Sequence, residues 1–345
     1  MLRWGEQVGI DLGTSHTQLC VRGQGIVVRQ PTVVAYAEGK RGVYAIGEEA
    51  RLMEGRDIPG VRVVRPLRGG VVADFDVAAD LVRFCLREAL GGRPLVPPIM
   101  VAAAPTESTP VEQRALHDCL RHAGAGKVYL VPKGLAAGRG LEQPIDQAEV
   151  RMIADVGAGA TDIGLMSMGA ITGGRSLHYA GDDLDEAIVR WVKRRGGIRI
   201  GAHTAEQIKL RVSAVLPELA RQHISVDDLQ SNNGNLLDAD VPLHEVPAVL
   251  AKAVAPVAGE IAWLMENLPP ERRAELQANG MAITGGTALL RGLAALMEER
   301  TGLPVTVARD PLSCTILGIE TILEDLDSLS LSGRRFAHPI REREA

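Results

Sequence analysis

The sequence predicts an α/β protein made of two related domains that hold a phosphate-bearing ligand between them. The chain has 345 residues, more than one ordinary hydrophobic core accommodates. A strand–turn–strand pattern occurs twice, 144 positions apart, and a glycine-rich strand–turn–helix pattern follows near the end of the chain. Together these three observations predict a duplicated fold.

The composition is typical of a globular protein and limits its partners. Apolar residues make up 46% of the chain and charged residues 23%. A formal net charge of −5 and an aromatic content of 3% do not favour a nucleic-acid partner. The four cysteines form no CxxC pair, so we expect small buried side chains. We expect no signal peptide and no membrane span, because the start lacks an apolar h-region and no window approaches about eighteen consecutive apolar residues.

The repeat relates residues 8–26 (VGIDLGTSHTQLCVRGQGI) to residues 152–170 (MIADVGAGATDIGLMSMGA). Asp11 aligns with Asp155, and every aligned pair is separated by 144 positions. The other identical pairs are Gly13 with Gly157, Thr17 with Thr161, and Gly25 with Gly169. Two matched copies are stronger evidence than one short glycine motif.

Each copy predicts a β-hairpin with a phosphate-binding tip. A short apolar run predicts a buried strand, which ends in Asp before a turn of small residues. Small residues let backbone N–H groups approach phosphate oxygens, and the Asp can hold Mg²⁺, usually through water. Two such hairpins facing each other would grip a nucleotide's phosphates from both sides. The alternative is two ordinary hairpin turns. The Asp argues against it, because Asp is unfavourable in a strand unless it has a function there.

Residues 280–300 predict a third glycine turn, between a strand and a helix that begins at Ala288. The bare backbone of Gly285 and Gly286 allows a flat ring or a sugar to lie against it. Many α/β loops have this pattern, so the turn is evidence for a binding site only because it follows the two hairpin turns in chain order.

Helices are predicted between the second and third turns. Residues 204–216 predict one, with Thr204 as its N-cap. Residues 246–268 predict a long amphipathic helix. Glu206 and Lys209 lie three positions apart on one helix face, which by itself favours a surface ion pair. An earlier helix has the apolar face Leu184, Ala187, Ile188, Trp191 and Val192.

At these residues the chain resembles the actin, chaperone and sugar-kinase superfamily, and within it the MreB family. GIDLGTSHT and DVGAGATDIGLMSMGAI resemble its two phosphate motifs, and ITGGTALLRGL resembles its adenosine motif. The stretch RPLRGGVVADFDV (65–77) and the segments AGDDLDEAIVRWVKRR, IGAHTAEQIKL, TGLPV and DPLSCTILG are also similar to the family. The resemblance extends from about residue 8 to residue 325.

The resemblance implies an α/β fold of two duplicated ribonuclease H-like (actin-like ATPase) domains. Each domain would carry a small inserted subdomain, and a nucleotide cleft would lie between the two. The implied divisions are 1–31 plus 66–145 (large domain I), 32–65 (its subdomain), 146–181 plus 245–326 (large domain II), 182–244 (its subdomain) and 327–345 (a mobile tail).

The resemblance also implies ATP and Mg²⁺ in the cleft, with Asp11 and Asp155 orienting the metal through water. The phosphates would contact Gly13, Thr14, Ser15, His16, Gly157, Ala158 and Gly159. The ribose and adenine would contact Glu206, Lys209, Gly285, Gly286 and Thr287. The expected assembly is a homopolymer filament in the cytoplasm, peripheral to the inner membrane, that organises cell shape and cell-wall synthesis with the elongation machinery.

Two positions depart from the family pattern where hydrolysis takes place. The family has Glu-Glu-Pro after the strand that here reads VYLV, and Lys133 stands where the second Glu positions the attacking water. Ala160, beside Thr161, replaces a hydroxyl implicated in hydrolysis. A protonated lysine cannot accept the water's hydrogen bond, although it can pair with the γ-phosphate, so we expect slow or absent hydrolysis. The alternative is that Asp162 or another segment compensates.

A loop before the predicted strand 99–103 is a candidate membrane contact. By resemblance an apolar loop here dips into the membrane, and Leu95 and Val96 occupy its position. The alternative is that both residues pack on the core of their own domain. Trp4 could add an interfacial anchor.

Further expectations concern a hairpin and the rival functions. Residues 228–241 predict a β-hairpin. A small-molecule kinase of the same superfamily, or a nucleotide-dependent scaffold that does not polymerise, are the alternative functions. A chaperone ATPase domain would continue into a β-rich peptide-binding domain.

Overall fold

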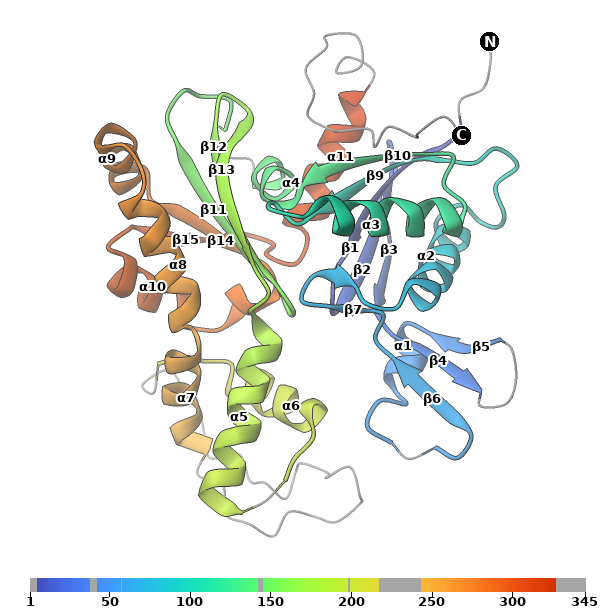
Figure 1. Cartoon of the computed structure of the whole chain (residues 1–345), viewed down its shortest axis with the longest axis horizontal. Helices are drawn as coiled ribbons and strands as arrows, with labels where there is room; N and C mark the ends of the chain where they lie inside the picture. Colours follow the sequence, from blue (N-terminus) through green and yellow to red (C-terminus); the bar gives the residue numbers. More distant parts are fainter. Residues whose placement is uncertain are drawn as a thin grey trace.

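The computed structural model describes residues 5–37, 42–56, 58–141, 145–197, 199–216 and 243–326. Two α/β halves lie side by side, each built on a five-stranded sheet (Figure 1). The hairpin predicted at 228–241, the tail after 326 and Trp4 lie outside the described residues.

The first sheet contains the first predicted hairpin. Its central strand pairs antiparallel with the next strand in the chain and parallel with a later one. The order is β10 (Lys127–Pro132), β9 (Ile99–Ala104), β1 (Gln7–Leu12), β2 (His16–Val21) and β3 (Gly25–Pro31).

The second sheet repeats this arrangement, and the duplicated actin-like fold expected from the sequence is confirmed. Its central strand again pairs antiparallel with the following strand and parallel with a later one. The order is β13 (Ala170–Leu177), β12 (Thr161–Ser167), β11 (Arg151–Val156), β14 (Met281–Thr284) and β15 (Val305–Val307).

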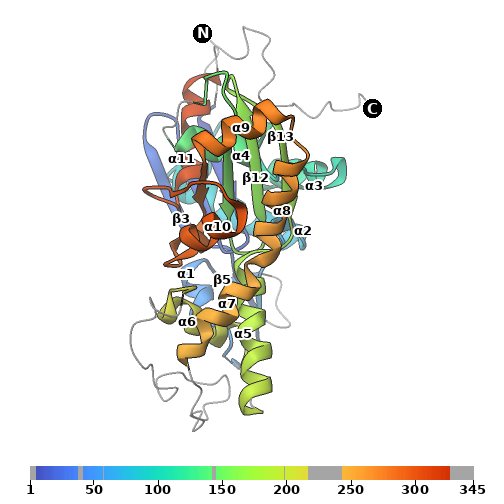
Figure 2. The ribbon, with the colours of Figure 1, turned by 90° about the vertical axis from the view of Figure 1, so that its left-hand side faces the viewer.

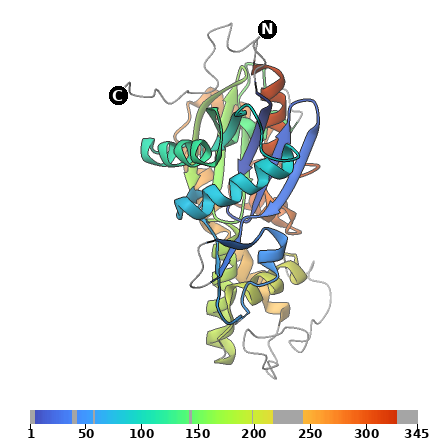
Figure 3. The same ribbon diagram turned by 90° about the vertical axis from the view of Figure 1, so that its right-hand side faces the viewer.

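Helices cover the outer face of each sheet. Figure 3 shows α2 (Phe75–Ala89) and α3 (Pro110–Ala123) over the first sheet, and their buried side chains form one core with β1 and β2. Figure 2 shows α8 (Ala255–Glu266) and α10 (Leu293–Thr301) over the second sheet. Burial of these apolar faces is the main force that holds each half together. The outer helix α9 (Pro270–Asn279) contacts β11.

Two helices lie between the sheets. α11 (Cys314–Glu324) packs against β1, β2 and β9, while α4 (Lys133–Gly140) contacts both α11 and the second sheet. Their close approach requires glycine, because a Cβ on Gly318 would overlap the carbonyl oxygen of Ala136. A Cβ on Gly140 would likewise overlap the carbonyl oxygen of Cys314. The helix α11, which we assigned by resemblance to domain II, therefore joins the two halves.

Small subdomains extend below each sheet in Figure 1. Under the first sheet lie β4 (Val34–Ala37), β5 (Val43–Ile46), β6 (Val61–Val64) and α1 (Glu48–Arg51). Under the second lie α5 (Gly181–Gly196), α6 (Ala202–Val212) and α7 (Val246–Ala253). A two-stranded ribbon of β7 (Leu67–Arg68) and β8 (Val71–Val72) lies near the first domain's edge facing the second.

Three helix predictions were wrong at their boundaries. The helix expected over 246–268 is divided into α7 and α8 at Val254, two residues before Pro256, which lies in the first turn of α8. α6 begins at Ala202, so Thr204 is buried inside the helix and Gly201 is its N-cap. The helix expected from Ala288 begins at Leu293, after a 3₁₀ turn over Gly286–Leu289.

The segment Val246–Glu266 is long and apolar enough by length and composition to cross a membrane. However, Val246, Leu250, Val257 and Ile261 are buried in the core of the second domain. This packing identifies α7 and α8 as core helices. The four cysteines are free and buried, as expected.

Candidate functional site: a cleft between the two sheets

A cavity of about 620 Å³ lies where the three predicted glycine turns meet. Its volume falls in the range of roughly 300–1,000 Å³ that is typical of small-molecule sites. The sequence-predicted residues that line it are Asp11, Gly13, Thr14, Ser15, His16, Lys133, Asp155, Gly157, Ala158, Gly159, Ala160, Glu206, Lys209, Gly285, Gly286 and Thr287. Residues from five separate segments of the sequence, the three glycine turns together with Lys133 and the Glu206–Lys209 pair, therefore share one cavity.

The two hairpin turns have the same backbone geometry. The N–H of Gly13 donates to the carbonyl of His16 at 3.1 Å, and the N–H of Gly157 donates to the carbonyl of Ala160 at 3.0 Å. These two bonds occupy equivalent positions in the repeat. Both turns also border the cavity, so their remaining backbone N–H groups can serve an anion.

The tips of the two turns meet across the cleft. A Cβ on Gly159 would fall 2.6 Å from Thr14 Oγ1, a distance that excludes any side chain there without movement. The N–H of Gly70 donates to the same Thr14 oxygen at 3.0 Å, and Nδ1 of His178 donates to the carbonyl of Gly69 at 2.6 Å. The Gly69–Gly70 turn between β7 and β8 thus helps to join the domains. Its glycine pair lies within the family-like stretch 65–77, and no sequence pattern assigned it a role.

Carboxylates from both sheets surround the ammonium of Lys133. Its Nζ lies 3.3 Å from Asp155 Oδ2 and 3.8 Å from Asp11 Oδ1, and the lysine side chain is 19% exposed. Burial alone would lower the pKa of Lys133, but attraction to Asp11, Asp155 and Asp162 outweighs it and raises the pKa above its usual value. The lysine is therefore a cation at neutral pH.

Hydrogen bonds fix the two carboxylates of the second sheet. Thr315 Oγ1 of α11 donates to Asp155 Oδ2 at 3.0 Å. Asp162 Oδ1 accepts from the N–H of Thr106 at 2.8 Å and from the hydroxyl of Ser176. Burial raises the pKa of Asp162. One of the two carboxylate oxygens of Asp162, which also lines the cavity, is thus already engaged twice.

These residues do not fit a Mg²⁺ ion held directly between Asp11 and Asp155. The ammonium of Lys133 lies within ion-pair distance of both carboxylates, and a divalent cation placed there would be repelled by it. Within the described ranges, no three His, Cys, Asp or Glu side chains are grouped so that they could hold a metal. A metal carried on a nucleotide through water remains a prediction.

The part of the cavity formed by α6 and the third turn is partly apolar, because Leu210, Leu289 and Leu290 line it. Lys209 Nζ donates to the carbonyl of Gly181 at 2.9 Å and to Asp185 Oδ2 at 2.8 Å. Lys209 therefore pairs with a buried acid of α5, and the surface pair with Glu206 is not the arrangement observed. Thr287 Oγ1 donates to the carbonyl of Gly157 at 2.8 Å, which fixes the third turn against the second.

Three further predicted residues, Thr161, Leu95 and Val96, do not line the cavity. Thr161 is fully buried and its hydroxyl donates to the carbonyl of Tyr179 at 2.8 Å, so it faces domain II and not the cleft. Leu95 is fully exposed and Val96 is half-exposed. Leu95 therefore does not pack on the core of its own domain.

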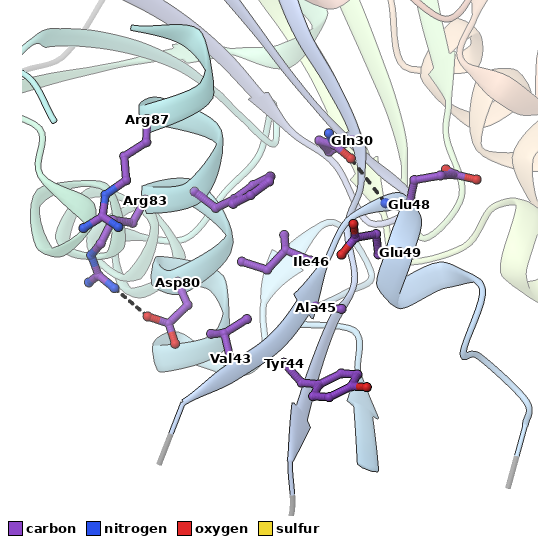
Figure 4. A pocket seen from close by; sticks show the side chains of 11 residues that line it. Gln30, Val43, Tyr44, Ala45, Ile46, Glu48, Glu49, Asp80, Arg83 and Arg87 are labelled. Atoms are coloured by element: carbon purple, nitrogen blue, oxygen red, sulfur yellow. Dashed lines mark hydrogen bonds and ion pairs between the residues drawn. The ribbon is translucent and has the colours of Figure 1, made fainter. Parts of the chain in front are cut away.

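A second cavity, of about 450 Å³, lies between β5 and α2 (Figure 4). Tyr44 and Val43 come from β5, and Arg83 pairs with Asp80 along α2. None of the residues predicted as site residues is among the described residues that line it.

Two five-stranded sheets of the same topology, facing each other across a nucleotide-sized cleft, define an actin-like protein. The model of the MreB/Mbl protein family matches residues 5–331. The chain therefore belongs to the MreB/Mbl family.

Individual relatives agree with this assignment. The cell shape-determining protein Mbl of Bacillus subtilis is 37% identical over 328 residues, covering 94% of this chain and 98% of that protein. The cell shape-determining protein MreB of Escherichia coli is 33% identical over 329 residues, covering 94% and 95%. The crystal structure of MreB 5 of Spiroplasma citri bound to AMPPNP is 27% identical, with a TM-score of 0.86, and covers 96% of this chain and 99% of that one.

Proposed function

We propose that this chain binds ATP in the cleft and polymerises into filaments that organise cell shape. The observation that carries the proposal is the pair of equivalent glycine turns, one from each sheet, on opposite sides of one cavity. Backbone N–H groups on both sides suit a ligand with several phosphates. The third turn, at Gly285 and Gly286, leaves bare backbone where a base and ribose can lie.

The relatives support the nucleotide and the process. Structures of the Spiroplasma citri MreB5 protein were solved with AMPPNP and with ADP. The Bacillus subtilis and Escherichia coli relatives are named cell shape-determining proteins. By this relationship the filaments would lie in the cytoplasm against the inner membrane and work with the cell-wall elongation machinery. Exposed Leu95 and Val96 would provide part of the membrane contact, and avidity along a filament would strengthen each weak contact.

Hydrolysis of the bound ATP is proposed to be slow. Lys133 is a cation paired with Asp11 and Asp155, so it cannot accept a hydrogen bond from the attacking water. Ala160 lines the cavity without a hydroxyl. Losing a general base typically costs roughly 10²–10⁴ in rate. Phosphate release well above the slow basal rate of a working family member would contradict this part of the proposal, and Lys133→Glu is expected to accelerate release.

The binding proposal is tested by calorimetric titration of ATP into the wild type and into Gly286→Val. A Cβ at Gly286 would lie 3.5 Å from Leu312, an ordinary contact, so valine fits the protein but projects into the cavity. We expect the affinity to fall at least about tenfold, equivalent to about 1.4 kcal/mol. Gly259→Val, on the exposed side of α8, is the matched control and is expected to bind like the wild type. Equal binding by both variants would place the nucleotide elsewhere.

Filament formation is tested separately by sedimentation and electron microscopy with and without ATP. Nucleotide-dependent filaments support the proposal. Binding without assembly would instead indicate the alternative of a scaffold that does not polymerise. ATP consumption that depends on an added sugar would indicate the small-molecule kinase.

A further inference from the structure

The fold places one cation between the two aspartates that mark the ends of the mirrored strands. Lys133 Nζ lies 3.3 Å from Asp155, on β11 of the second sheet, and 3.8 Å from Asp11, on β1 of the first. The same lysine lines the cavity in which we propose that the nucleotide binds. The ammonium therefore links the two sheets and faces the site at the same time.

The position of this ammonium is set by the backbone that carries it. Lys133 is the first residue of α4, directly after β10 ends at Pro132. The next residue, Gly134, donates its N–H to Thr106 Oγ1 at 3.0 Å. A Cβ on Gly134 would lie 3.0 Å from the Cα of Gly164, so the start of α4 is held tightly against β12. The backbone from which the lysine side chain extends to the carboxylates is therefore held in place.

The ammonium can serve a phosphate while it is paired. It has three N–H donors, and Asp11 and Asp155 can occupy two of them. The third is available for a phosphate oxygen in the cavity. Asp162 lines the same cavity and also attracts the lysine, so the charges of three carboxylates act on one ammonium.

We propose that Lys133 is a tethered counter-ion for the nucleotide, so that binding does not require a divalent cation between Asp11 and Asp155. This inference rests on the proposed binding of ATP in the cleft. A divalent ion normally offsets repulsion between carboxylates and phosphates. Here a covalently attached cation already occupies that position, and a divalent ion could enter only by displacing it.

Calorimetric titration of ATP in buffer containing Mg²⁺ and in buffer containing a chelator tests the inference. For the wild type we expect the two dissociation constants to agree within about threefold, and for Lys133→Met we expect the chelator to weaken binding by more than about tenfold. Methionine has a similar length and no charge, so the variant leaves three carboxylates facing the phosphates. Lys127→Met is the control for the loss of one positive charge and should behave like the wild type, because Lys127 is exposed at the start of β10, the strand that precedes Lys133.

The outcomes separate this inference from the proposed function. Wild-type binding that is lost with the chelator would overturn the role of Lys133 but leave ATP binding in place. No wild-type binding in either buffer would overturn the proposed function itself. The wild-type comparison decides between these results even where Lys133→Met does not fold. A Lys133→Met protein that folds and binds equally in both buffers would show that the lysine is not the counter-ion.

Discussion

The contact between α4 and α11 gives the sharpest prediction about stability, because it depends on the absence of a single methyl group. Gly318 of α11 lies so close to α4 that a Cβ would overlap the carbonyl oxygen of Ala136. That oxygen belongs to a helix backbone and cannot rotate away. Gly318→Ala must therefore push apart the two helices that lie between the sheets.

The expected magnitude follows from two opposing effects. Overpacking a core typically costs about 1–3 kcal/mol, and a rigid backbone neighbour places this site at the upper end. Alanine regains about 1 kcal/mol of helix propensity relative to glycine. We expect Gly318→Ala to lower the free energy of unfolding by about 2 kcal/mol, the difference between these effects.

Urea unfolding of two further glycine variants tests whether the cost is specific to the contact between α4 and α11. Gly138 lies in α4, and a Cβ there would meet the flexible end of the Met166 side chain. Gly138→Ala should therefore cost less stability than Gly318→Ala. A Cβ on Gly259 in α8 would meet no described atom within 4 Å, so Gly259→Ala should raise the free energy of unfolding by about 0.5–1 kcal/mol. If Gly318→Ala were as stable as Gly259→Ala, the account of this helix contact would be refuted.

Other predictions concern a buried ion pair and the exposed loop. Lys209→Met removes the partner of Asp185, whose side chain is 8% exposed. The expected cost in urea unfolding is about 1.5–3 kcal/mol, that of a lost hydrogen bond to a charged group, because the carboxyl can take up a proton; a cost under about 1 kcal/mol would count against the pair. Burial raises the pKa of Asp185 from 3.8 to about 7, so its favourable contribution is complete below pH 3.8 and is lost as the pH rises through about 7. Because asparagine does not titrate, Asp185→Asn should become more stable relative to the wild type as the pH rises from about 5 to about 8. A difference in the free energy of unfolding that stays constant over this range would contradict the raised pKa of Asp185. Replacing Leu95 and Val96 by serine should reduce flotation with liposomes, whereas Val111→Ser, at a similarly exposed position on α3, should not.

The mirrored hairpins could be predicted from the sequence because each is local. A short apolar run, an Asp and a small-residue turn specify strand, turn and strand within a few positions, and the 144-residue spacing links the two copies. The turns at Gly13 and Gly157 consequently have the predicted form.

Features that depend on distant contacts were not predicted. The sequence identified Lys133 as a departure from the family, but only the folded chain places its ammonium between Asp11 and Asp155. Similarly, the sequence around Gly318 and Gly140 does not show that these residues must be glycine. The requirement follows only from the packing of α11 against α4 and the first sheet. The division of the 246–268 helix had a local signal, since Pro256 lies in the first turn of α8.

The central claim is that the two mirrored turns close on one nucleoside triphosphate. A crystal structure of the protein grown with a non-hydrolysable ATP analogue tests it most directly. We expect the phosphates between the Gly13–His16 turn and the Gly157–Ala160 turn, with an oxygen in contact with Lys133 Nζ. An analogue bound elsewhere, with these two turns free of phosphate, would contradict the account.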